Sequence, residues 1–243
     1  MKNLQVLTPH QNCIYNCPFC IAKSHNHLNN FENNYEKNYK LWKNNLIYTI
    51  ITNTDLKYVI ITGTNEPMQS KACIKDIINI VRSVNKNIQI EIQTRYYGQD
   101  EIFNMVDVVA YSISKPRILN RIKPMGKIQR YVLILTDDFN NYKLNEILNL
   151  MPKSVNQLTF KLLEDSEGKN IEFDNYIHSH RINKSTLEKL REDINNYKGN
   201  ISIRLDENCM DSINRYMIFR EDGNIYESWD DYEKSSEKTY RKK

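Results

Sequence analysis

The stretch LQVLTPHQNCIYNCPFC (residues 4–20) joins a short apolar run to a loop that holds three of the chain's five cysteines. Leu4–Thr8 predicts a first β-strand, because its apolar side chains are bounded by turn-forming residues. Cys13, Cys17 and Cys20 follow with C-x3-C-x2-C spacing. The sequence therefore predicts three thiols in a loop at the carboxyl end of the first strand.

Three thiolates are one ligand short of a closed structural zinc site, which uses four. Cys73 and Cys209 are the remaining cysteines, and neither has a near neighbour that would complete a second pair. The triplet instead indicates a cubane [4Fe–4S] cluster whose fourth iron is open to a small ligand. Two other interpretations stay open: a zinc site completed by His10, His25 or His27, and a pair of redox thiols.

The triplet, with Phe19 before its last cysteine, resembles the radical S-adenosylmethionine (SAM) superfamily. The resemblance implies that Cys13, Cys17 and Cys20 bind three irons, while SAM chelates the fourth through its amino and carboxylate groups. It also implies an external electron donor, such as flavodoxin or ferredoxin. Reductive cleavage of SAM would then give methionine and a 5′-deoxyadenosyl radical that abstracts hydrogen from a substrate.

Strand-like runs alternate with helical patterns along the chain, which predicts an α/β fold with a parallel sheet. Tyr58–Thr62 is a near-continuous apolar run, as expected of a strand buried on both faces. Later strands are predicted at Ile88–Gln93, Val106–Ile113, Tyr131–Leu135, Leu158–Leu162 and Ile201–Leu205. Short helices are expected over 100–105 and 116–122. Six βα units up to residue 197 agree with the partial, TIM-like (β/α)6 barrel that the resemblance implies.

The length of 243 residues suits one large α/β domain. We expect a barrel core over residues 1–197 and a short extension over 198–243 within the same domain. In the extension, Asp222-Gly223 is a hairpin turn signal, and the basic residues near the end are typical of a frayed tail.

The segment after the second strand, Thr62-Gly63-Thr64-Asn65-Glu66-Pro67, resembles the family's G-G-E-P motif. Thr64 and Asn65 take the two glycine positions, and Glu66 and Pro67 are retained. The resemblance implies that this backbone and the Glu66 carboxylate accept hydrogen bonds from the amino group of SAM. Asn tolerates left-handed backbone better than most residues, so the turn is feasible without the glycine.

Four further residues at strand ends are candidates for SAM binding. Arg95 follows the third strand and is predicted to meet the SAM carboxylate or an anionic substrate, since guanidinium binds carboxylates bidentately; a solvated loop position is the alternative. Ser112 and Ser114 lie on one side of the fourth strand, where similar proteins contact the ribose or carboxylate of SAM. Leu135, or its neighbour Leu133, is expected to pack against adenine, although core packing explains both leucines equally well.

The substrate is less constrained than the cofactor. Members of the family that modify peptides often carry extra cysteine-ligated clusters, which Cys73 and Cys209 cannot form. A small molecule such as a nucleotide or sugar is therefore the preferred expectation, with a peptide or protein partner as the alternative. The residue that completes catalysis is unknown, and Cys209 is retained as a candidate hydrogen donor. A non-enzymatic zinc-binding or Fe–S protein is the alternative of another class.

The composition of the chain limits the binding partners and the cellular compartment that we expect for it. The net charge is +4, and Lys and Arg are spread along the chain, so nucleic acid is not expected as a partner. No apolar run approaches the length of a membrane span, and no signal segment precedes the first strand. Clustered thiols without a secretory signal predict a reducing cytoplasm.

Overall fold

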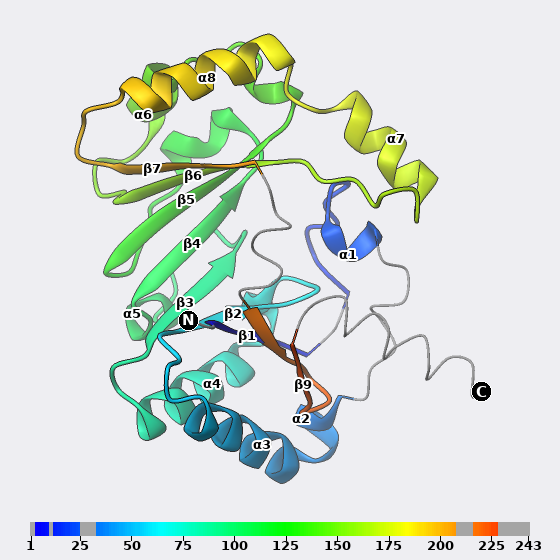
Figure 1. The fold of residues 1–243 in the computed structure, drawn as a ribbon. Helices are drawn as coiled ribbons and strands as arrows, with labels where there is room; N and C mark the ends of the chain where they lie inside the picture. The colour runs from blue at the N-terminus through cyan, green and yellow to red at the C-terminus, as the bar shows by residue number, and fades with distance from the viewer. Residues whose placement is uncertain (1–2, 10–11, 25–32, 208–215, 228–243) are drawn as a thin grey trace.

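The computed structural model describes residues 3–9, 12–24, 33–207 and 216–227, and its strands form a single curved sheet (Figure 1). The strands are β1 (Asn3–Leu7), β2 (Tyr58–Thr62), β3 (Gln89–Thr94), β4 (Val108–Ile113), β5 (Ile128–Leu135), β6 (Gln157–Leu162), β7 (Ser202–Asp206), β8 (Tyr216–Phe219) and β9 (Ile225–Tyr226). Their order in the sheet is β7-β6-β5-β4-β3-β2-β1-β8-β9. All neighbouring pairs are parallel except β8 and β9. The fold is therefore a mixed α/β fold with a mostly parallel sheet, consistent with a partial barrel.

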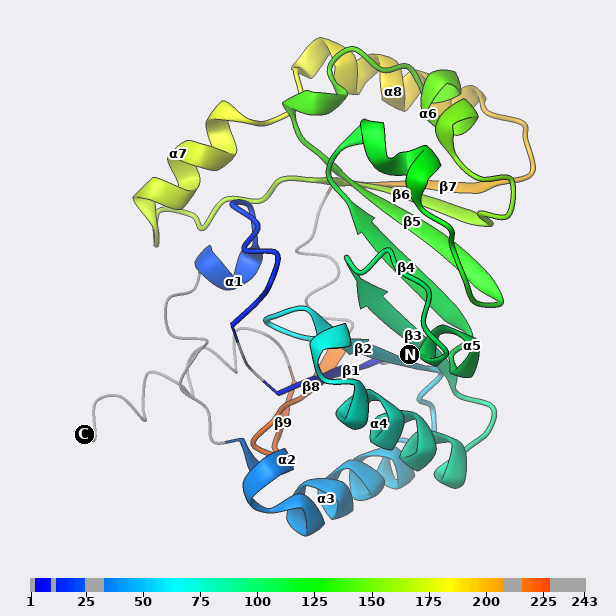
Figure 2. The ribbon, with the colours of Figure 1, turned by 180° about the vertical axis from the view of Figure 1, so that it is seen from behind.

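In the described part of the chain, helices cover the outer face of the sheet and leave its concave face open (Figure 1 and Figure 2). The helical elements are α1 (Ile21–Ser24), α2 (Asn34–Lys37), α3 (Tyr39–Thr52), η1 (Pro67–Gln69), α4 (Lys71–Val84), α5 (Ile102–Met105), η2 (Pro116–Arg121), η3 (Asp137–Phe139), α6 (Leu144–Leu150), α7 (Ile171–Ser179) and α8 (Lys184–Asn196). Helices α3 and α4 lie along the part of the sheet that contains β1 and β2, and α6 and α8 lie along the part near β6 and β7 (Figure 2). Helix α7 lies apart from them, beside α1.

Alternation along the strands separates an apolar outer face from a polar concave face. Ile61, Ile92 and Leu133 face the helices and are fully buried. On the opposite face, Arg130 and Lys161 are only partly buried. A closed TIM barrel fills its interior with branched apolar side chains, so this open and polar interior leaves room for a ligand.

The sheet is wider than the six strands expected of the core. Strand β7 pairs with β6, and β8 pairs with β1 in the register Leu4↔Met217. The boundary expected between residues 197 and 198 thus falls between α8 and β7, and the strands that follow it join the same sheet. The hairpin turn at Asp222-Gly223 is confirmed, because β8 and β9 are antiparallel and Gly223 has a φ of +77°.

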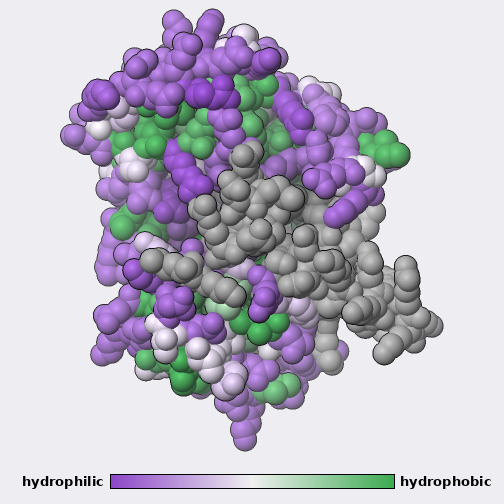
Figure 3. All heavy atoms as spheres, viewed as in Figure 1, coloured by the Kyte–Doolittle hydropathy of each residue, from purple (hydrophilic) through white to green (hydrophobic). Residues whose placement is uncertain are grey.

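The expected short helices are present as α5 and as the 3-10 helix η2. In the described part of the chain, none of the helices combines the length and the apolar character needed to cross a membrane. The outward surface of α8 is largely hydrophilic (Figure 3), as expected of a helix that packs on the sheet with one face only.

Candidate functional site

Three cysteines, the carboxyl ends of the five strands β2 to β6 and the segment that follows β6 line one cavity of about 240 Å³ at this edge of the sheet. Parallel strands bring their carboxyl ends to the same edge, and the loops that follow them gather there. The lining residues include Cys13, Cys17, Cys20, Thr64, Asn65, Glu66, Gln93, Arg95, Ser112, Ile134, Lys161, Leu163 and Glu164. The cysteine loop after β1 and the segment after β2 therefore open onto the same space.

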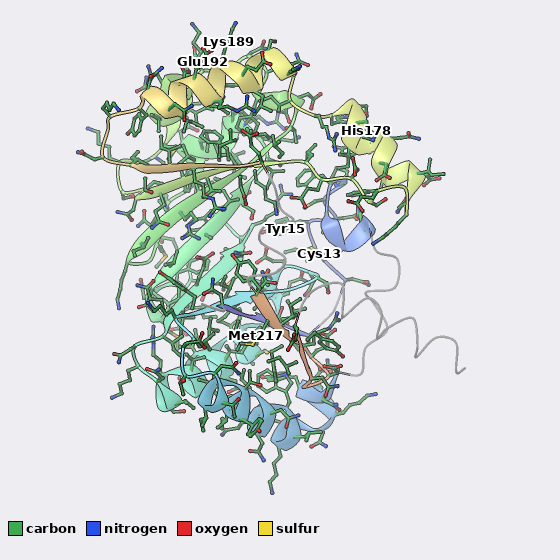
Figure 4. The ribbon with its side chains drawn as sticks, viewed as in Figure 1. Cys13, Tyr15, His178, Lys189, Glu192 and Met217 are labelled. Carbon is green, nitrogen blue, oxygen red and sulfur yellow. The ribbon has the colours of Figure 1, made fainter. Side chains whose placement is uncertain are left out.

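The cysteine loop makes a tight turn before α1. The N–H of Cys20 donates to the carbonyl oxygen of Cys17 at 3.2 Å, and the N–H of Lys23 donates to the carbonyl oxygen of Cys20 at 2.8 Å. Asn16 has a φ of +41°, a left-handed conformation that Asn adopts more readily than most residues. Figure 4 shows Cys13 and Tyr15 on this loop, in the middle of the molecule. All three thiols are free, and Cys17 is the most buried of them.

Gln69 of η1 ties the cysteine loop to the segment after β2. Its Nε2 donates to the carbonyl oxygen of Asn12 at 2.9 Å, and its Oε1 accepts from the N–H of Ile14 at 3.2 Å. The sequence gives no sign of this contact, because 55 positions separate Ile14 from Gln69.

On its other side, the loop packs against α7 and β5. A small apolar cluster there consists of Leu163, Phe173 and Ile177, with Phe19 and Ile134 packed against it. The Asn170 side chain donates to the carbonyl oxygen of Lys23 at 2.9 Å and caps α7 by accepting from the N–H of Phe173 at 3.1 Å. The loop is thus held on both sides by residues distant in sequence.

Glu66 is 4% exposed and its carboxylate has three donors from the protein. Oε1 accepts from the Thr94 hydroxyl at 2.5 Å and from the N–H of Met68 at 3.0 Å, while Oε2 accepts from the N–H of Arg95 at 2.8 Å. Burial raises the pKa of Glu66, and these hydrogen bonds offset part of the increase. The carboxylate therefore joins the ends of β2 and β3, and its Oε2 has acceptor capacity left for a ligand.

Arg95 places a cation beside the cysteines. Its guanidinium carbon lies 5.6 Å from the ring centres of both Tyr15 and Phe19, within the range of cation–π contact. Nη1 donates to the Cys17 sulfur and Nη2 donates to the Ser114 hydroxyl at 3.3 Å. Burial raises the pKa of Tyr15 to about 12, so its phenol stays neutral.

Two buried oxygens face each other across Gly63. A Cβ at Gly63 would lie 2.7 Å from Thr8 Oγ1 and 3.0 Å from Asn65 Oδ1, so a side chain does not fit there without a shift. Among the described residues, neither oxygen has a hydrogen-bond partner. Asn65 lines the cavity and is 7% exposed, so an unpaired acceptor is costly there until a donor arrives. An ammonium group would satisfy it.

Cysteine thiolates are the ligands of iron–sulfur clusters, so the chemistry of the donor set suits such a cluster. Within the ranges that the structure describes, no three His, Cys, Asp or Glu side chains are close enough to hold one metal ion. The three thiols nevertheless open onto one cavity. The expected zinc alternatives, His10, His25 and His27, lie outside the described residues.

The other candidates from the sequence are spread over the edge of the sheet. Ser112 lines the cavity, and the buried Ser114 contacts Arg95 instead. Leu135 is fully buried in the main core, and the adjacent Ile134 is the β5 residue that lines the cavity. Cys209 lies outside the described residues.

Two other side chains lie away from the cavity. Cys73 is 1% exposed, on the core face of α4. His178 is exposed on α7, with Nε2 3.8 Å from Asp165 (Figure 4).

Sequence comparison finds no relatives: no protein-family model matches the chain, and no curated protein does. Solved structures of Streptococcus suis SuiB do match, and each alignment covers 93% of this chain. SuiB bound to S-adenosylmethionine has a TM-score of 0.61 at 15% identity. The chain has the fold of SuiB. SuiB bound to the precursor peptide SuiA has a TM-score of 0.56 at 12% identity, and a further SuiB structure has 0.59 at 14%.

The match to SuiB confirms the resemblance stated above at the level of the fold. This chain covers 58–59% of the SuiB chains, so it spans about three fifths of their length. SuiB is bound to SAM in one of these structures and to the precursor peptide SuiA in another.

Proposed function

We propose that this chain is a radical SAM enzyme. The observation that carries the proposal is the cavity shared by three free cysteines and the Glu66 segment, in a fold that binds SAM in SuiB. Cys13, Cys17 and Cys20 would hold a [4Fe–4S] cluster. When bound, the cluster would supply the electron that cleaves SAM reductively and so generates a 5′-deoxyadenosyl radical, with flavodoxin or ferredoxin as the external donor.

The protein's own groups would bind and orient the cofactor. Asn65 Oδ1 and the Glu66 carboxylate accept hydrogen bonds from the SAM amino group, together with the backbone at Thr64. Ser112 also lines the cavity, where it would contact the ribose or the carboxylate. The apolar cluster around Phe19, Ile134 and Leu163 takes the adenine side and excludes water, which such reactive chemistry requires. Arg95 adds positive charge beside the cysteine loop, and Ser114 positions it.

A peptide is the substrate class that we propose. SuiB holds a precursor peptide in a fold that aligns with 93% of this chain. The open concave face is lined by polar groups such as Gln93, Arg130 and Lys161, which suit a polar chain more than an apolar ligand. The small molecule expected from the sequence has less support and becomes the alternative outcome of the test.

The first test is cofactor loading and SAM cleavage. Anaerobic reconstitution should give a brown protein with nearly four irons per chain, and SAM with dithionite should release 5′-deoxyadenosine. Cys17→Ala should lose both properties. Cys73→Ala is the matched control, because Cys73 is buried in the core away from the cavity, and it should keep both. One stoichiometric zinc with no SAM cleavage would refute the proposal.

The second test separates the substrate classes. Extract from cells grown in deuterated medium is divided by size into a peptide fraction and a small-metabolite fraction. Each fraction is incubated with the loaded protein, SAM and dithionite. Deuterium in 5′-deoxyadenosine from the peptide fraction alone supports a peptide substrate, and deuterium from the metabolite fraction alone reverses the assignment.

A further inference from the structure

Three contacts of the Arg95 guanidinium are with the cysteine loop, and a fourth is with Ser114. Its two cation–π partners, Tyr15 and Phe19, lie two positions before and two positions after Cys17 in the sequence. Nη1 donates to the Cys17 sulfur. Nη2 donates to the hydroxyl of Ser114, the residue after β4. The planar guanidinium is thus fixed in orientation as well as in position.

The backbone of Arg95 is fixed independently of its side chain. Its N–H donates to Glu66 Oε2 at 2.8 Å, and the preceding Thr94 donates to Glu66 Oε1. The N–H of Tyr96 in turn donates to Thr94 Oγ1 at 2.9 Å. The backbone of Arg95 is therefore fixed by hydrogen bonds at residues 94, 95 and 96. These bonds hold the Arg95 Cα in place for the contact of its side chain with Cys17.

These contacts differ from those of an open carboxylate clamp. A guanidinium that binds a carboxylate bidentately presents two parallel N–H groups to it. Here one terminal nitrogen is on a cysteine sulfur and the other is on a serine hydroxyl. Both terminal nitrogens have protein partners, while the buried Nε has none among the described residues.

We propose that Arg95 is a positioning residue that tunes the cluster: it donates a charged hydrogen bond to the Cys17 thiolate and raises the reduction potential of the bound cluster. The inference rests on the proposed function. Hydrogen bonds to the sulfurs and net charge are among the factors that set cluster potentials. The reduced cluster carries one more negative charge than the oxidised cluster, so a fixed cation on a ligand sulfur stabilises the reduced form more.

The experiment measures the midpoint potential of the reconstituted cluster without SAM, by titration with dithionite and detection of the reduced cluster by electron paramagnetic resonance. One electron passes from dithionite to each cluster. For Arg95→Gln, we expect about a tenfold lower ratio of reduced to oxidised cluster at a given potential, which for one electron is a shift of about 59 mV to more negative potential. Arg95→Lys keeps the charge but not the planar fork, and it should shift the potential less.

Lys23→Gln is the matched control. It removes one positive charge next to the same loop, where Lys23 Nζ donates to the carbonyl oxygen of Asn16 at 3.2 Å rather than to a sulfur. A larger shift for Arg95→Gln than for Lys23→Gln, at equal iron content, supports a hydrogen bond to Cys17 over nearby charge alone. Equal shifts in the two variants would overturn the inference.

The affinity for SAM provides the remaining distinction. If Arg95→Gln weakens SAM binding to the loaded protein but leaves the SAM-free potential unchanged, Arg95 is a carboxylate clamp and the tuning role is wrong. If the wild-type protein assembles no four-iron cluster, the proposed function itself fails. The two failures are therefore distinguishable from iron content and potential, without any activity measurement.

Discussion

Replacement of Glu66 by Gln tests the central hydrogen-bond network of the site. Gln has the shape of Glu but carries one acceptor oxygen and one donor nitrogen. In the wild type, the N–H groups of Met68 and Arg95 donate to opposite oxygens of the carboxylate. Whichever way the Gln amide is oriented, its NH2 group faces one of these two donors. One buried backbone N–H therefore loses its partner.

The expected cost follows from that single unpaired donor. A buried donor without a partner costs about 1–3 kcal/mol. A loss of about 2 kcal/mol in a chain of this size lowers Tm by about 4–8 °C. The measurement is urea unfolding and thermal melting of the cluster-free, reduced protein at neutral pH, followed by circular dichroism.

A surface carboxylate provides the control for this substitution. Glu101 is 76% exposed in its side chain and pairs with Lys75 at 2.6 Å. Glu101→Gln should change the free energy of unfolding by less than about 0.5 kcal/mol. If Glu66→Gln is as stable as Glu101→Gln, the Glu66 carboxylate does not hold the ends of β2 and β3 together and the assignment of its three hydrogen bonds is wrong.

Three further substitutions and one pH profile test other parts of the site. Gly63→Ala should destabilise the protein by about 1–3 kcal/mol through overpacking. Adding Thr8→Ala should restore part of the lost stability, because the Thr8 hydroxyl oxygen is the atom nearest to the new Cβ. No recovery in the double variant would contradict the steric argument. Arg130→Gln removes the ion-pair partner of the Glu91 carboxylate, which is 4% exposed and lies 2.6 Å from Arg130. The expected cost in the free energy of unfolding is about 2–4 kcal/mol, below the usual range for a buried pair because the Arg130 side chain is 28% exposed. The double variant Arg130→Gln with Glu91→Gln should be more stable than Arg130→Gln alone. Gln69→Ala should speed iron loss to a chelator several-fold, because it removes two exposed hydrogen bonds of about 0.5–1.5 kcal/mol each from the cysteine loop. An unchanged rate of iron loss would mean that the Gln69 side chain does not hold the loop. Finally, burial raises the pKa of Glu66 above its ordinary value of 4.5, so the folded protein holds this proton more tightly than the unfolded chain. The stability of the wild type relative to Glu66→Gln should therefore fall as pH rises from about 4.5 through the higher folded pKa. A rise in relative stability over this range would show that the pKa of Glu66 is lowered instead.

The parts of the fold that the sequence predicts well are those encoded by local pattern. The apolar run at Tyr58–Thr62 is a strand with Val59 and Ile61 fully buried, as its composition indicates. The cysteine spacing and the Gly63–Glu66 segment meet at one cavity, because both follow parallel strands that are adjacent in the sheet. The order of the strands and the residue types in the loops were sufficient to predict that these two segments lie together.

Two kinds of feature could not be predicted from the sequence: which face of a strand lines the cavity, and which residues far apart in the sequence are in contact. The last residues of β5 are apolar on both faces, with Ile134 on the cavity side and Leu135 in the core, so alternation alone did not show which of the two lines the cavity. The contact from Arg95 to Cys17 joins residues 78 positions apart. The parallel pairing of β8 with β1 joins strands from the two ends of the chain, and no local pattern encodes it.

The Gln69 contact has a thermodynamic consequence for the proposed enzyme. Gln69 lies in the helical turn capped by Glu66, and its side chain holds the backbone of the cysteine loop at Asn12 and Ile14. One short turn thus borders both the cluster ligands and the SAM-binding segment. Ordering of either side favours ordering of the other, and linkage requires the effect to be reciprocal. SAM should therefore slow loss of iron by the same coupling free energy by which the cluster strengthens SAM binding through this turn.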